Sequence, residues 1–285
     1  MSPSVVQICQ TLEVNRSGYY AWMNRPESNR RKKNLELVKE IRRVHKKNKG
    51  RYGAPRITRV LKANGQECSE NRVARLMQKE AIFGCQRRKF RPQTTTPNHE
   101  YPVAPRILKT EEPETHPTAP NQLWVSDITY VDTCEGWLYL TTFLDLFNRK
   151  VVGHAMADSL ATEPIWEAMK NGIMGEKEAL APGAAPLMVH SDRGCQYASE
   201  YFREKLMLLG VAQSMSRKGN CYDNAYAETF FHTIKVELIH RQKFATREEA
   251  KLEITDYIKW YNCERLHSSL DYQTPDSYRP VSLVV

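Results

Sequence analysis

Three acidic residues occupy positions from which carboxylates can hold metal ions. Asp127 closes the apolar run QLWVSD, Asp192 follows a second run in PLMVHSD, and Glu228 lies 36 positions later in a stretch with helical character. Mg²⁺ prefers carboxylate oxygens as ligands and keeps coordination positions open for water and phosphate. Two such ions can activate an attacking oxygen and stabilise a leaving one. The pattern therefore predicts phosphodiester chemistry at a two-metal site, with Mg²⁺ or Mn²⁺ as the cofactor.

The setting of these acids is more informative than their spacing, because 33 Asp and Glu supply many acidic pairs by chance. Asp127 and Asp192 each follow a run typical of a strand, at the point where the chain would leave a sheet. A lone aspartate there would serve a turn or a helix N-cap equally well. Glu228 and Lys235 are seven residues apart, so two helical turns place them on one face. We therefore expect Lys235 to hold a DNA phosphate beside the metals.

The elements that must position these residues begin at Asn121. The pattern predicts three strands, a helix, a strand, a helix, a short strand and a helix, over residues 122–132, 137–147, 150–157, 162–174, 186–192, 199–210, 211–216 and 223–239. This order indicates an α/β core with a mixed sheet flanked by helices. Neighbouring strand ends would then bring Asp127 and Asp192 together across 65 residues of sequence.

The N-terminal third differs in charge. Residues 1–92 hold 23 Lys and Arg against 7 Asp and Glu, a net of +16, whereas the remainder holds 19 against 26, a net of −7. A basic module joined to an acidic one is typical of a nucleic-acid-binding domain attached to a domain with a second activity. The alternative is a solvated basic face or a disordered tail. Apolar helical periodicity through this region favours the folded module.

Two helices separated by a short turn are predicted near the end of this module. Residues 56–65 form the first, and Ser69 caps a second that stops at Gly84, which together give a helix-turn-helix signature. An ordinary helical hairpin with a charged surface is the alternative. In the second helix Val73, Leu76 and Met77 are expected to face inward. The DNA contacts are expected from Asn71, Arg72, Arg75 and Lys79, and also from Arg87, Arg88, Arg217 and Lys218 in basic or loop segments.

Four segments follow from these patterns. They are a basic helical DNA-binding region (1–91), a linker with seven prolines (92–120), the catalytic core (121–241), and a helix and tail that pack on the core (242–285). Within the basic region, residues 1–25 are predicted to form a short helical pair. The following helix is predicted to bury Leu35, Val38, Ile41 and Val44 or His45 along one stripe.

Several motifs in one order resemble the DDE transposases and retroviral-type integrases. More narrowly, the chain resembles the second-frame, OrfB-type transposases of bacterial insertion sequences. The matching stretches are YGAPRITRVL, RVARLMQKEAIFG, WVSDITYV, HSDRGCQYAS, DNAYAETFFHTIKVELI and YNCERLHSSLDYQTPDSY. The resemblance implies a ribonuclease-H-like core with Asp127, Asp192 and Glu228 as the catalytic triad and Lys235 as the basic residue that follows it. The tail departs from the family pattern, with Leu266 in place of the usual Pro and Asp271 in place of a frequent Gly.

The same resemblance implies a reaction and its partners. Water would cleave the phosphodiester at an element end and free a 3′-OH, which would then attack a target phosphate in line, without ATP and without a covalent protein–DNA intermediate. The DNA partners would be the terminal inverted repeats and the target, and the chain would act as a homo-oligomer on DNA. An upstream frame often supplies a further helix-turn-helix and zipper in this family. Since this chain has no heptad zipper, such a partner or fusion stays an open alternative.

Composition excludes other classes of protein. Seven scattered cysteines without a CxxC pair indicate reduced thiols, neither disulfides nor the zinc module of retroviral integrases. The sequence has no run of 18 apolar residues and no signal-peptide pattern, so we expect a cytoplasmic, nucleoid-associated protein. Two other functions remain open, a metal nuclease that does not join strands and a non-catalytic DNA-binding regulator.

Other residues near the predicted site are interpreted as structural. Asp145 precedes a hairpin turn, and His190 and His267 adjoin apolar runs, where histidine is more often a core residue than a base. Arg193 is predicted to lie in a loop that can hold phosphate. The aromatic residues Tyr222, Tyr226, Phe230 and Phe231 bracket Glu228, and we expect most of them in the core, with one possible exception that would stack on a DNA base.

Overall fold

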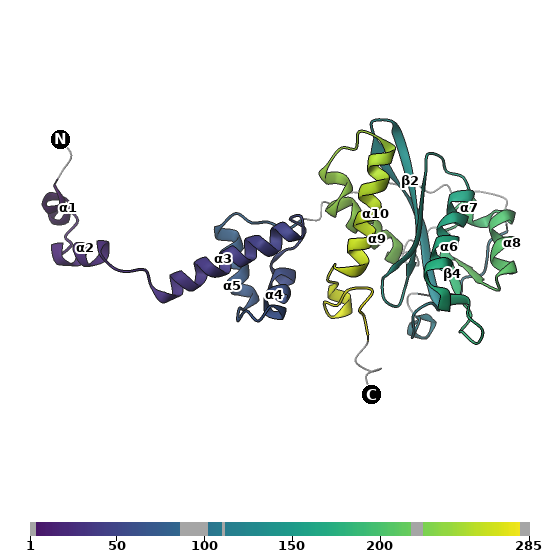
Figure 1. The fold of residues 1–285 in the computed structure, drawn as a ribbon, viewed down its shortest axis with the longest axis horizontal. Helices are drawn as coiled ribbons and strands as arrows, with labels where there is room; N and C mark the ends of the chain where they lie inside the picture. The colour runs from purple at the N-terminus through teal and green to yellow at the C-terminus, as the bar shows by residue number, and fades with distance from the viewer. Residues whose placement is uncertain (1–3, 86–101, 110–111, 218–224, 280–285) are drawn as a thin grey trace. The chain divides into compact units, whose positions relative to one another are not determined.

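The structure is a computed structural model that describes residues 4–85, 102–109, 112–217 and 225–279. It divides into two compact units, Met1–Cys85 and Gln86–Val285 (Figure 1). Each unit is described by itself. The boundaries of the four predicted segments stay a prediction.

The first unit begins with the expected pair of short helices. They are α1 (Val5–Thr11) and α2 (Arg16–Met23). Ser4 and Gln7 form a reciprocal capping box at the start of α1, and the Asn15 side chain accepts from the Ser17 amide at the start of α2. The pair buries little, because Cys9 is its buried side chain among the described residues of the two helices.

Three further helices form the core of the first unit. They are α3 (Asn29–Lys47), α4 (Ala54–Ala63) and α5 (Glu70–Lys79), and each contacts the other two. Their shared core is built from the buried side chains of Leu37, Val38, Ile41, Val44, Tyr52, Ile57, Leu61, Val73 and Met77. Ser69 caps α5 as predicted, through a bond from the Arg72 amide to its hydroxyl. The helix-turn-helix pair is therefore α4 and α5.

Two predictions about this unit are wrong. Leu35 is 47% exposed, because the buried stripe of α3 starts only at Leu37. The helix α5 ends at Lys79 and does not reach Gly84. Ala81 turns into the left-handed region at φ 51°, after which Ile82 is buried and the Phe83 carbonyl lies 2.9 Å from His45 Nε2. Tertiary packing thus ends a segment whose composition would continue the helix.

The second unit is built on a five-stranded mixed sheet. The strands are β1 (Leu123–Thr133), β2 (Gly136–Asp145), β3 (Val151–Ala157), β4 (Met188–Ser191) and β5 (Ala212–Met215), in the order β3-β2-β1-β4-β5. Strands β1, β2 and β3 pair antiparallel, whereas β4 pairs parallel to both β1 and β5. This confirms the predicted mixed sheet and its five strands.

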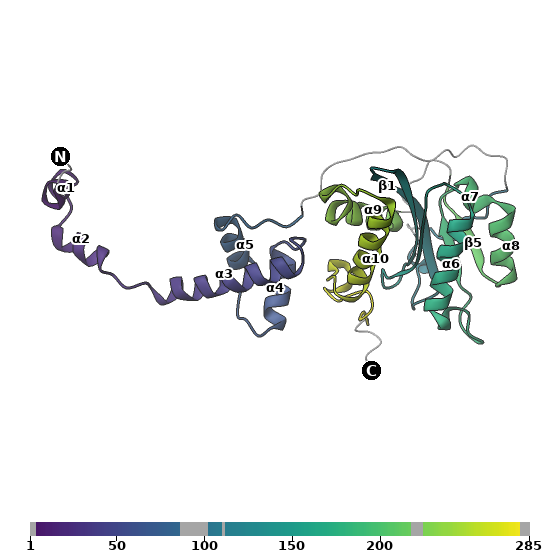
Figure 2. The same ribbon diagram turned by 45° about the horizontal axis from the view of Figure 1, so that its top comes forward.

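Helices cover both faces of this sheet (Figure 2). On one face lie α6 (Glu163–Gly175), α7 (Cys195–Ala198) and α8 (Glu200–Leu208), and on the other lie α9 (Ala225–Glu237) and α10 (Arg247–Cys263). Successive β1 residues alternate between the two hydrophobic cores, since Leu123 and Val125 join the α9–α10 core and Trp124 joins the α6–α8 core. The three-layer α/β arrangement follows from this period of two.

Gly153 and Gly172 allow α6 to approach the sheet closely. A Cβ at Gly153 would lie 2.1 Å from the Ala168 carbonyl oxygen, and one at Gly172 would lie 3.0 Å from the Trp124 ring. Edge strand β3 and helix α6 can therefore come into backbone contact only where side chains are absent.

The C-terminal helix and tail are bound to the core by polar contacts. The Asn262 side chain accepts from the Val151 amide at 3.0 Å and donates to the Val151 carbonyl at 2.9 Å, so it mimics a neighbouring strand at the sheet edge. Asp271 takes the left-handed conformation, with φ 51° and ψ 36°, at the position where the transposase pattern that the sequence resembles often has Gly. The turn therefore forms without glycine.

Part of the proline-rich segment packs against the sheet within the second unit. The Ile107 and Leu108 amides both donate to the Ser214 hydroxyl, at 3.0 and 3.3 Å, and Leu108 is fully buried in the α9–α10 core. Residues 102–109 thus lie against β5 and are not separate from the sheet.

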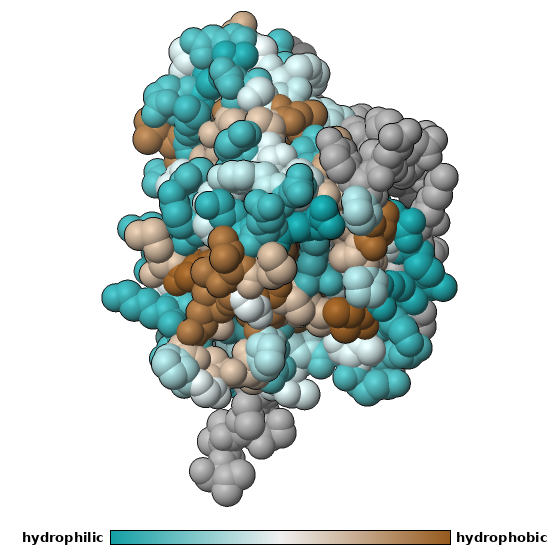
Figure 3. Space-filling model, turned by 90° about the vertical axis from the view of Figure 1, so that its right-hand side faces the viewer, coloured by the Kyte–Doolittle hydropathy of each residue, from teal (hydrophilic) through white to brown (hydrophobic). Residues whose placement is uncertain are grey.

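The outer surface of the second unit carries some apolar residues. Met207 and Leu208, at the end of α8, are 74% and 79% exposed. Figure 3 views the side of the unit on which α8 lies and shows apolar patches between hydrophilic areas. Scattered apolar side chains are normal on a protein surface, so they define no site by themselves. No helix within the described ranges is long and apolar enough to cross a membrane.

Candidate active site

Asp127 lies in the middle of β1, which corrects the prediction that it ends a strand. Strand β1 continues to Thr133, because Ile128–Thr133 pairs with β2 in a long hairpin. The neighbouring strand β4 stops earlier, with Ser191 paired to Ser126. Asp127 is therefore the first β1 residue beyond the end of β4, and it has the same parity as Leu123 and Val125, which face α9 and α10.

Asp192 follows β4 directly, as predicted. Because Ser126 and Ser191 are register partners, Asp127 and Asp192 are the next residues along two adjacent parallel strands, which are typically about 4.8 Å apart. The Gly194 amide donates to Asp192 Oδ1 at 2.9 Å, which fixes the side chain in a tight turn. A Cβ at Gly194 would lie 3.1 Å from that same oxygen, so the turn leaves little room for a larger residue.

Helix α9 carries Glu228 in its first turn and Lys235 in its last. Ala227, Phe230, Phe231 and Ile234 of this helix are buried against the sheet, as expected for most of the aromatic residues near Glu228. Glu228 is exposed, and the Lys235 ammonium lies 4.8 Å from the centroid of the Tyr130 ring on β1. The helix therefore runs along β1 with a carboxylate and a cation on the side of the aspartates.

The electrostatics of the three acids are coupled. Burial raises the pKa of Asp127 well above its ordinary value, the negative charge of Asp192 raises it further, and Glu228 adds a smaller effect. Burial and the charge of Asp192 also raise the pKa of Glu228. The Ile128 amide, which donates to Asp127 Oδ1 at 2.8 Å, and the Lys235 charge oppose the shift at Asp127. The site thus concentrates negative charge that a bound cation would neutralise.

The three acids are not equally close. The charge of Asp192 raises the pKa of Asp127 more than the charge of Glu228 does. Within the residues that the structure describes, no three His, Cys, Asp or Glu side chains are gathered as a metal-ligand cluster. The sheet register therefore brings the two aspartates together, and Glu228 is the member that stands apart on α9.

Lys235 is held in a partly desolvated setting. Burial lowers the pKa of its ammonium, and the charge of Asp127 acts in the opposite direction. The Tyr130 ring offers a π face to the cation but no hydrogen bond. The ammonium donors thus stay available to an anionic ligand beside the acids.

A buried tyrosine under the site was missed by sequence reasoning. The Tyr197 hydroxyl on α7 lies 2.8 Å from the Ser126 hydroxyl, one residue before Asp127. Burial raises the pKa of Tyr197 well above its ordinary value, and the charges of Asp127 and Asp192 add to the shift. Its position five residues after Asp192 is the signal in the sequence, because a turn and a short helix return the chain to the same strand ends.

The residues interpreted as structural have structural partners. His190 is fully buried, with Nδ1 2.8 Å from the Ser214 hydroxyl and Nε2 3.1 Å from the Ser216 hydroxyl. Asp145 is 1% exposed and accepts from the Asn121 and Phe147 amides, so it closes the turn after β2. Burial raises the pKa of Asp145 to about 6. His267 Nε2 lies 2.8 Å from Arg265 Nη1 in the tail.

Two cationic residues follow the strands that end near the site. Arg193 is half-buried, and its Nε donates to the Ser216 carbonyl at 2.7 Å, so it braces the loop after β4 against the end of β5. Arg217 is exposed just beyond β5. Lys218, Tyr222, Arg87 and Arg88 lie outside the described residues.

The other predicted DNA contacts belong to the first unit. Asn71, Arg75 and Lys79 are exposed on α5, whereas Arg72 is half-buried and its Nε donates to Asn34 Oδ1 of α3 at 3.0 Å. Val73 and Met77 face the core as predicted, and Leu76 is half-buried. Three of the four α5 residues are thus accessible to a ligand, and the fourth ties α5 to α3.

Comparison with known proteins assigns both units to described families. Residues 117–221 and 228–283 each match an integrase core domain, and residues 32–90 match an HTH-like domain. The uncharacterized 31 kDa protein of insertion element IS600 from Shigella sonnei is 40% identical, over 95% of this chain and 97% of that protein. The transposase InsF for insertion sequence IS3A from Escherichia coli K12 is 34% identical, over 98% of this chain and 95% of that protein. Among solved structures, an intasome of simian T-cell lymphotropic virus aligns with a TM-score of 0.48 and 13% identity, over 84% of this chain and 74% of that chain.

Proposed function

Since the chain belongs to the family of insertion-sequence transposases, we propose that Asp127, Asp192 and Glu228 are its catalytic carboxylates for DNA cleavage and joining. The reaction frees a 3′-OH at an element end and joins it to target DNA by transesterification. Asp127 and Asp192 lie side by side because Ser126 and Ser191 are paired in register, and this is the observation that carries the proposal. Two strands that are distant in sequence but adjacent in the sheet have no structural need to present acids at adjacent positions.

The donor set of this site fits divalent cations. Its ligands are carboxylate oxygens, and burial together with like charge raises the pKa of Asp127 in the absence of a compensating cation. We propose that Asp127 and Asp192 hold two Mg²⁺ or Mn²⁺ ions between them and that Glu228 completes one of the two sites. When bound, these ions activate the attacking oxygen and stabilise the leaving oxygen of the phosphodiester.

The remaining residues position the DNA and the acids. Lys235, whose ammonium is restrained over Tyr130, would contact a phosphate next to the scissile bond. Tyr197 would hold the β1 backbone at Ser126 through its hydroxyl, so that Asp127 keeps its orientation. Arg193 and Gly194 would keep the loop after Asp192 in one conformation. These residues act by fixing geometry, and none of them is needed as a base.

The first unit would bind DNA through its helix-turn-helix. We propose that the exposed face of α5, with Asn71, Arg75 and Lys79, contacts the terminal inverted repeats, whereas Arg72 positions α5 through Asn34. Arg87, Arg88, Arg217 and Lys218 remain proposed phosphate contacts. An insertion element has two ends, and we propose that the chain acts on them as a homo-oligomer.

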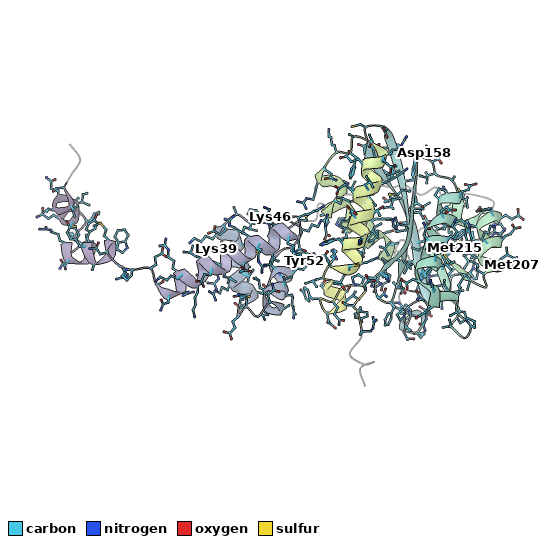
Figure 4. The ribbon with its side chains drawn as sticks, in the orientation of Figure 1. Lys39, Lys46, Tyr52, Asp158, Met207 and Met215 are labelled. Atoms are coloured by element: carbon cyan, nitrogen blue, oxygen red, sulfur yellow. The ribbon has the colours of Figure 1, made fainter. Side chains whose placement is uncertain are left out.

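The test is a joining assay on labelled element ends. We expect the full chain with Mg²⁺ to yield 3′-cleaved and strand-transferred products, and Asp192→Asn to yield neither while it still binds DNA. The matched control is Asp158→Asn, which removes one exposed carboxylate outside the site and should leave both products unchanged (Figure 4). Joined products from Asp192→Asn would refute the assigned site. Cleavage without joining in the wild type would favour a nuclease, and binding without either product would favour a regulator.

A further inference from the structure

The helix α3 carries more positive charge than the helix-turn-helix beside it. Its residues 29–47 include nine Lys and Arg against two Glu, a net of +7, whereas the helix-turn-helix pair has a net of +5, from +3 on α4 and +2 on α5. The helix-turn-helix motif directs attention to α5, its second helix. The charge distribution directs it to α3.

Three lysines form a straight row on the outer side of α3. Lys32, Lys39 and Lys46 are spaced by seven residues, so they recur every two turns with a drift of about 20°. The buried residues Leu37, Ile41 and Val44 lie on the opposite side of the helix. All three lysines are exposed, and within the described parts of the chain none of their side chains has an ion pair or hydrogen bond. We call this row the α3 lysine row; Figure 4 labels Lys39 and Lys46 on it.

The first turn of α3 is unfavourable for a helix that serves packing alone. Arg30, Arg31, Lys32 and Lys33 occupy it, with no acidic residue in that turn. The N-terminal end of a helix carries a partial positive charge, so these cations oppose both the helix dipole and one another. Glu27 compensates Arg31 through a pair of 3.0 Å, and this is the ion pair that the described residues provide for the four cations. Cations in the first turn of a helix lower its stability. Where no packing contact compensates for that loss, the residues indicate a functional surface.

This part of α3 also lies beyond the packed core of its unit. Residues 29–36 are exposed except for Asn34, and the buried residues start at Leu37. Figure 1 and Figure 2 both show the first turns of α3 extending past α4 and α5. The cations are therefore accessible along the full length of the helix.

We propose that α3 is a second DNA-contacting element, in which the α3 lysine row and the first-turn cations bind the phosphate backbone of duplex DNA without reading its sequence. The inference rests on the proposed function, since it assumes that the first unit binds DNA. At 1.5 Å per residue, the lysines lie about 10.5 Å apart along the helix. Duplex DNA rises 3.4 Å per phosphate on each strand, so this interval corresponds to about three phosphates. Helix α5 would then supply sequence recognition, and α3 would supply most of the salt-dependent affinity.

The salt dependence of binding tests this division of roles. Binding of the full chain to two unrelated labelled duplexes would be measured by fluorescence anisotropy, in EDTA to prevent cleavage, at several salt concentrations. Each lost phosphate contact reduces the magnitude of the negative slope of log K against log salt by about 0.9. The triple variant Lys32→Gln, Lys39→Gln, Lys46→Gln is therefore expected to lose up to about 2.7 from the slope, equally on both duplexes.

A matched variant controls for net charge. Lys177→Gln, Lys243→Gln, Lys259→Gln removes the same three charges from exposed sites of the second unit and should leave the slope nearly unchanged. Circular dichroism would confirm that both variants stay folded, which is expected because every substituted side chain is exposed. An equal slope for the α3 variant and the wild type, or an equal loss in the control, would overturn the inference and leave α5 as the DNA-binding element. A wild type that binds neither duplex in a salt-dependent way would overturn both the inference and the proposed DNA-binding role of the first unit.

Discussion

The two units present charge to DNA in opposite ways. In the second unit, acidic side chains are held beside one another by strand register, and burial makes their charge costly. In the first unit, basic side chains are exposed on helices and are placed only by helical periodicity. Charge that is fixed and partly desolvated can hold metal ions and do chemistry, whereas exposed charge attracts a polyanion along a surface.

This difference predicts how substitutions act. A change at Asp127 or Asp192 should have a large effect that does not depend on salt, with activity and stability moving in different directions. A change at the exposed cations should have a small effect that salt screens. If substitutions in the two units had the same size of effect and the same salt dependence, this distinction between the units would be wrong.

The largest effect is expected at Asp127. Asp127→Asn removes a carboxylate that would hold the metals. We expect a loss of about 4 kcal/mol of transition-state stabilisation, which corresponds to a rate about a thousandfold lower. The measurement is the single-turnover rate of strand cleavage in saturating Mg²⁺. Asp132→Asn, which removes an exposed β1 carboxylate five residues further along, is the matched control and should retain the wild-type rate.

The same substitution should stabilise the metal-free protein. Burial and the charge of Asp192 raise the pKa of Asp127 above its unfolded value, so the folded state binds the proton more tightly. Stability from this group is then present at low pH and is lost as pH rises from about 4 through the raised pKa. The Asp127→Asn variant has no ionisable group at this position, so it does not lose this stability as the pH rises. In EDTA, we expect the gain in Tm of Asp127→Asn over the wild type to be larger at pH 8 than at pH 5. A lower Tm for the variant at both pH values would contradict the electrostatic description of the site.

The next effect concerns the buried ion pair that joins the tail to α9. Arg265 and Glu237 are 4% and 5% exposed; Arg265 Nη2 donates to Glu237 Oε1 at 2.8 Å, and the Tyr257 hydroxyl donates to Oε2 at 2.9 Å. Arg265→Met leaves a buried carboxylate without its cation, which costs about 3 kcal/mol or more. Urea unfolding would measure this loss.

The double variant Arg265→Met, Glu237→Gln separates charge from shape. It removes the unpaired carboxylate while Tyr257 can still bond the amide oxygen, so we expect it to recover much of the stability. Recovery would indicate that the ion pair fixes the position of α9, and therefore of Glu228, more than it stabilises the fold. A double variant as unstable as the single one would instead assign the loss to packing of the Arg265 side chain.

Local sequence was sufficient for most of the elements. The strands of the second unit, its helices other than α7 and the cap at Ser69 all follow from apolar period, turn residues and capping chemistry. The strand predicted over 122–132 is close to β1, but the interpretation of Asp127 as a strand end is wrong, because β1 pairs with β2 beyond the point where β4 stops, and no local pattern encodes these partners. Two further contacts likewise depend on the tertiary fold. They are the ion pair between Glu237 and Arg265, 28 residues apart, and the hydrogen bond between the Tyr197 and Ser126 hydroxyls.

The first unit shows where periodicity misleads. Leu35 continues the apolar pattern of α3 but is exposed, because α4 and α5 cover only the part of α3 from Leu37 onward. The sequence EAIF, directly after α5, favours a helix, yet the buried Ile82 and the hydrogen bond between His45 and the Phe83 carbonyl end it. In both cases tertiary packing decides the outcome. The three acids follow from residue type and order, and their joint catalytic role remains the proposal that the joining assay tests.

The smallest effect is expected on α5, where it sharpens the contrast between affinity and specificity. Arg75 is exposed, and its Nε makes only a long contact of 3.4 Å to the Asn71 carbonyl of its own helix, so the side chain is free to turn toward DNA. If Arg75 contacts a base, Arg75→Ala should cost about 1–3 kcal/mol on the element end and little on an unrelated duplex. Competition between the two duplexes would measure this ratio at fixed salt. A loss that is equal on both duplexes and lowers the salt slope would assign Arg75 to phosphate, and then α5 and α3 would share one role.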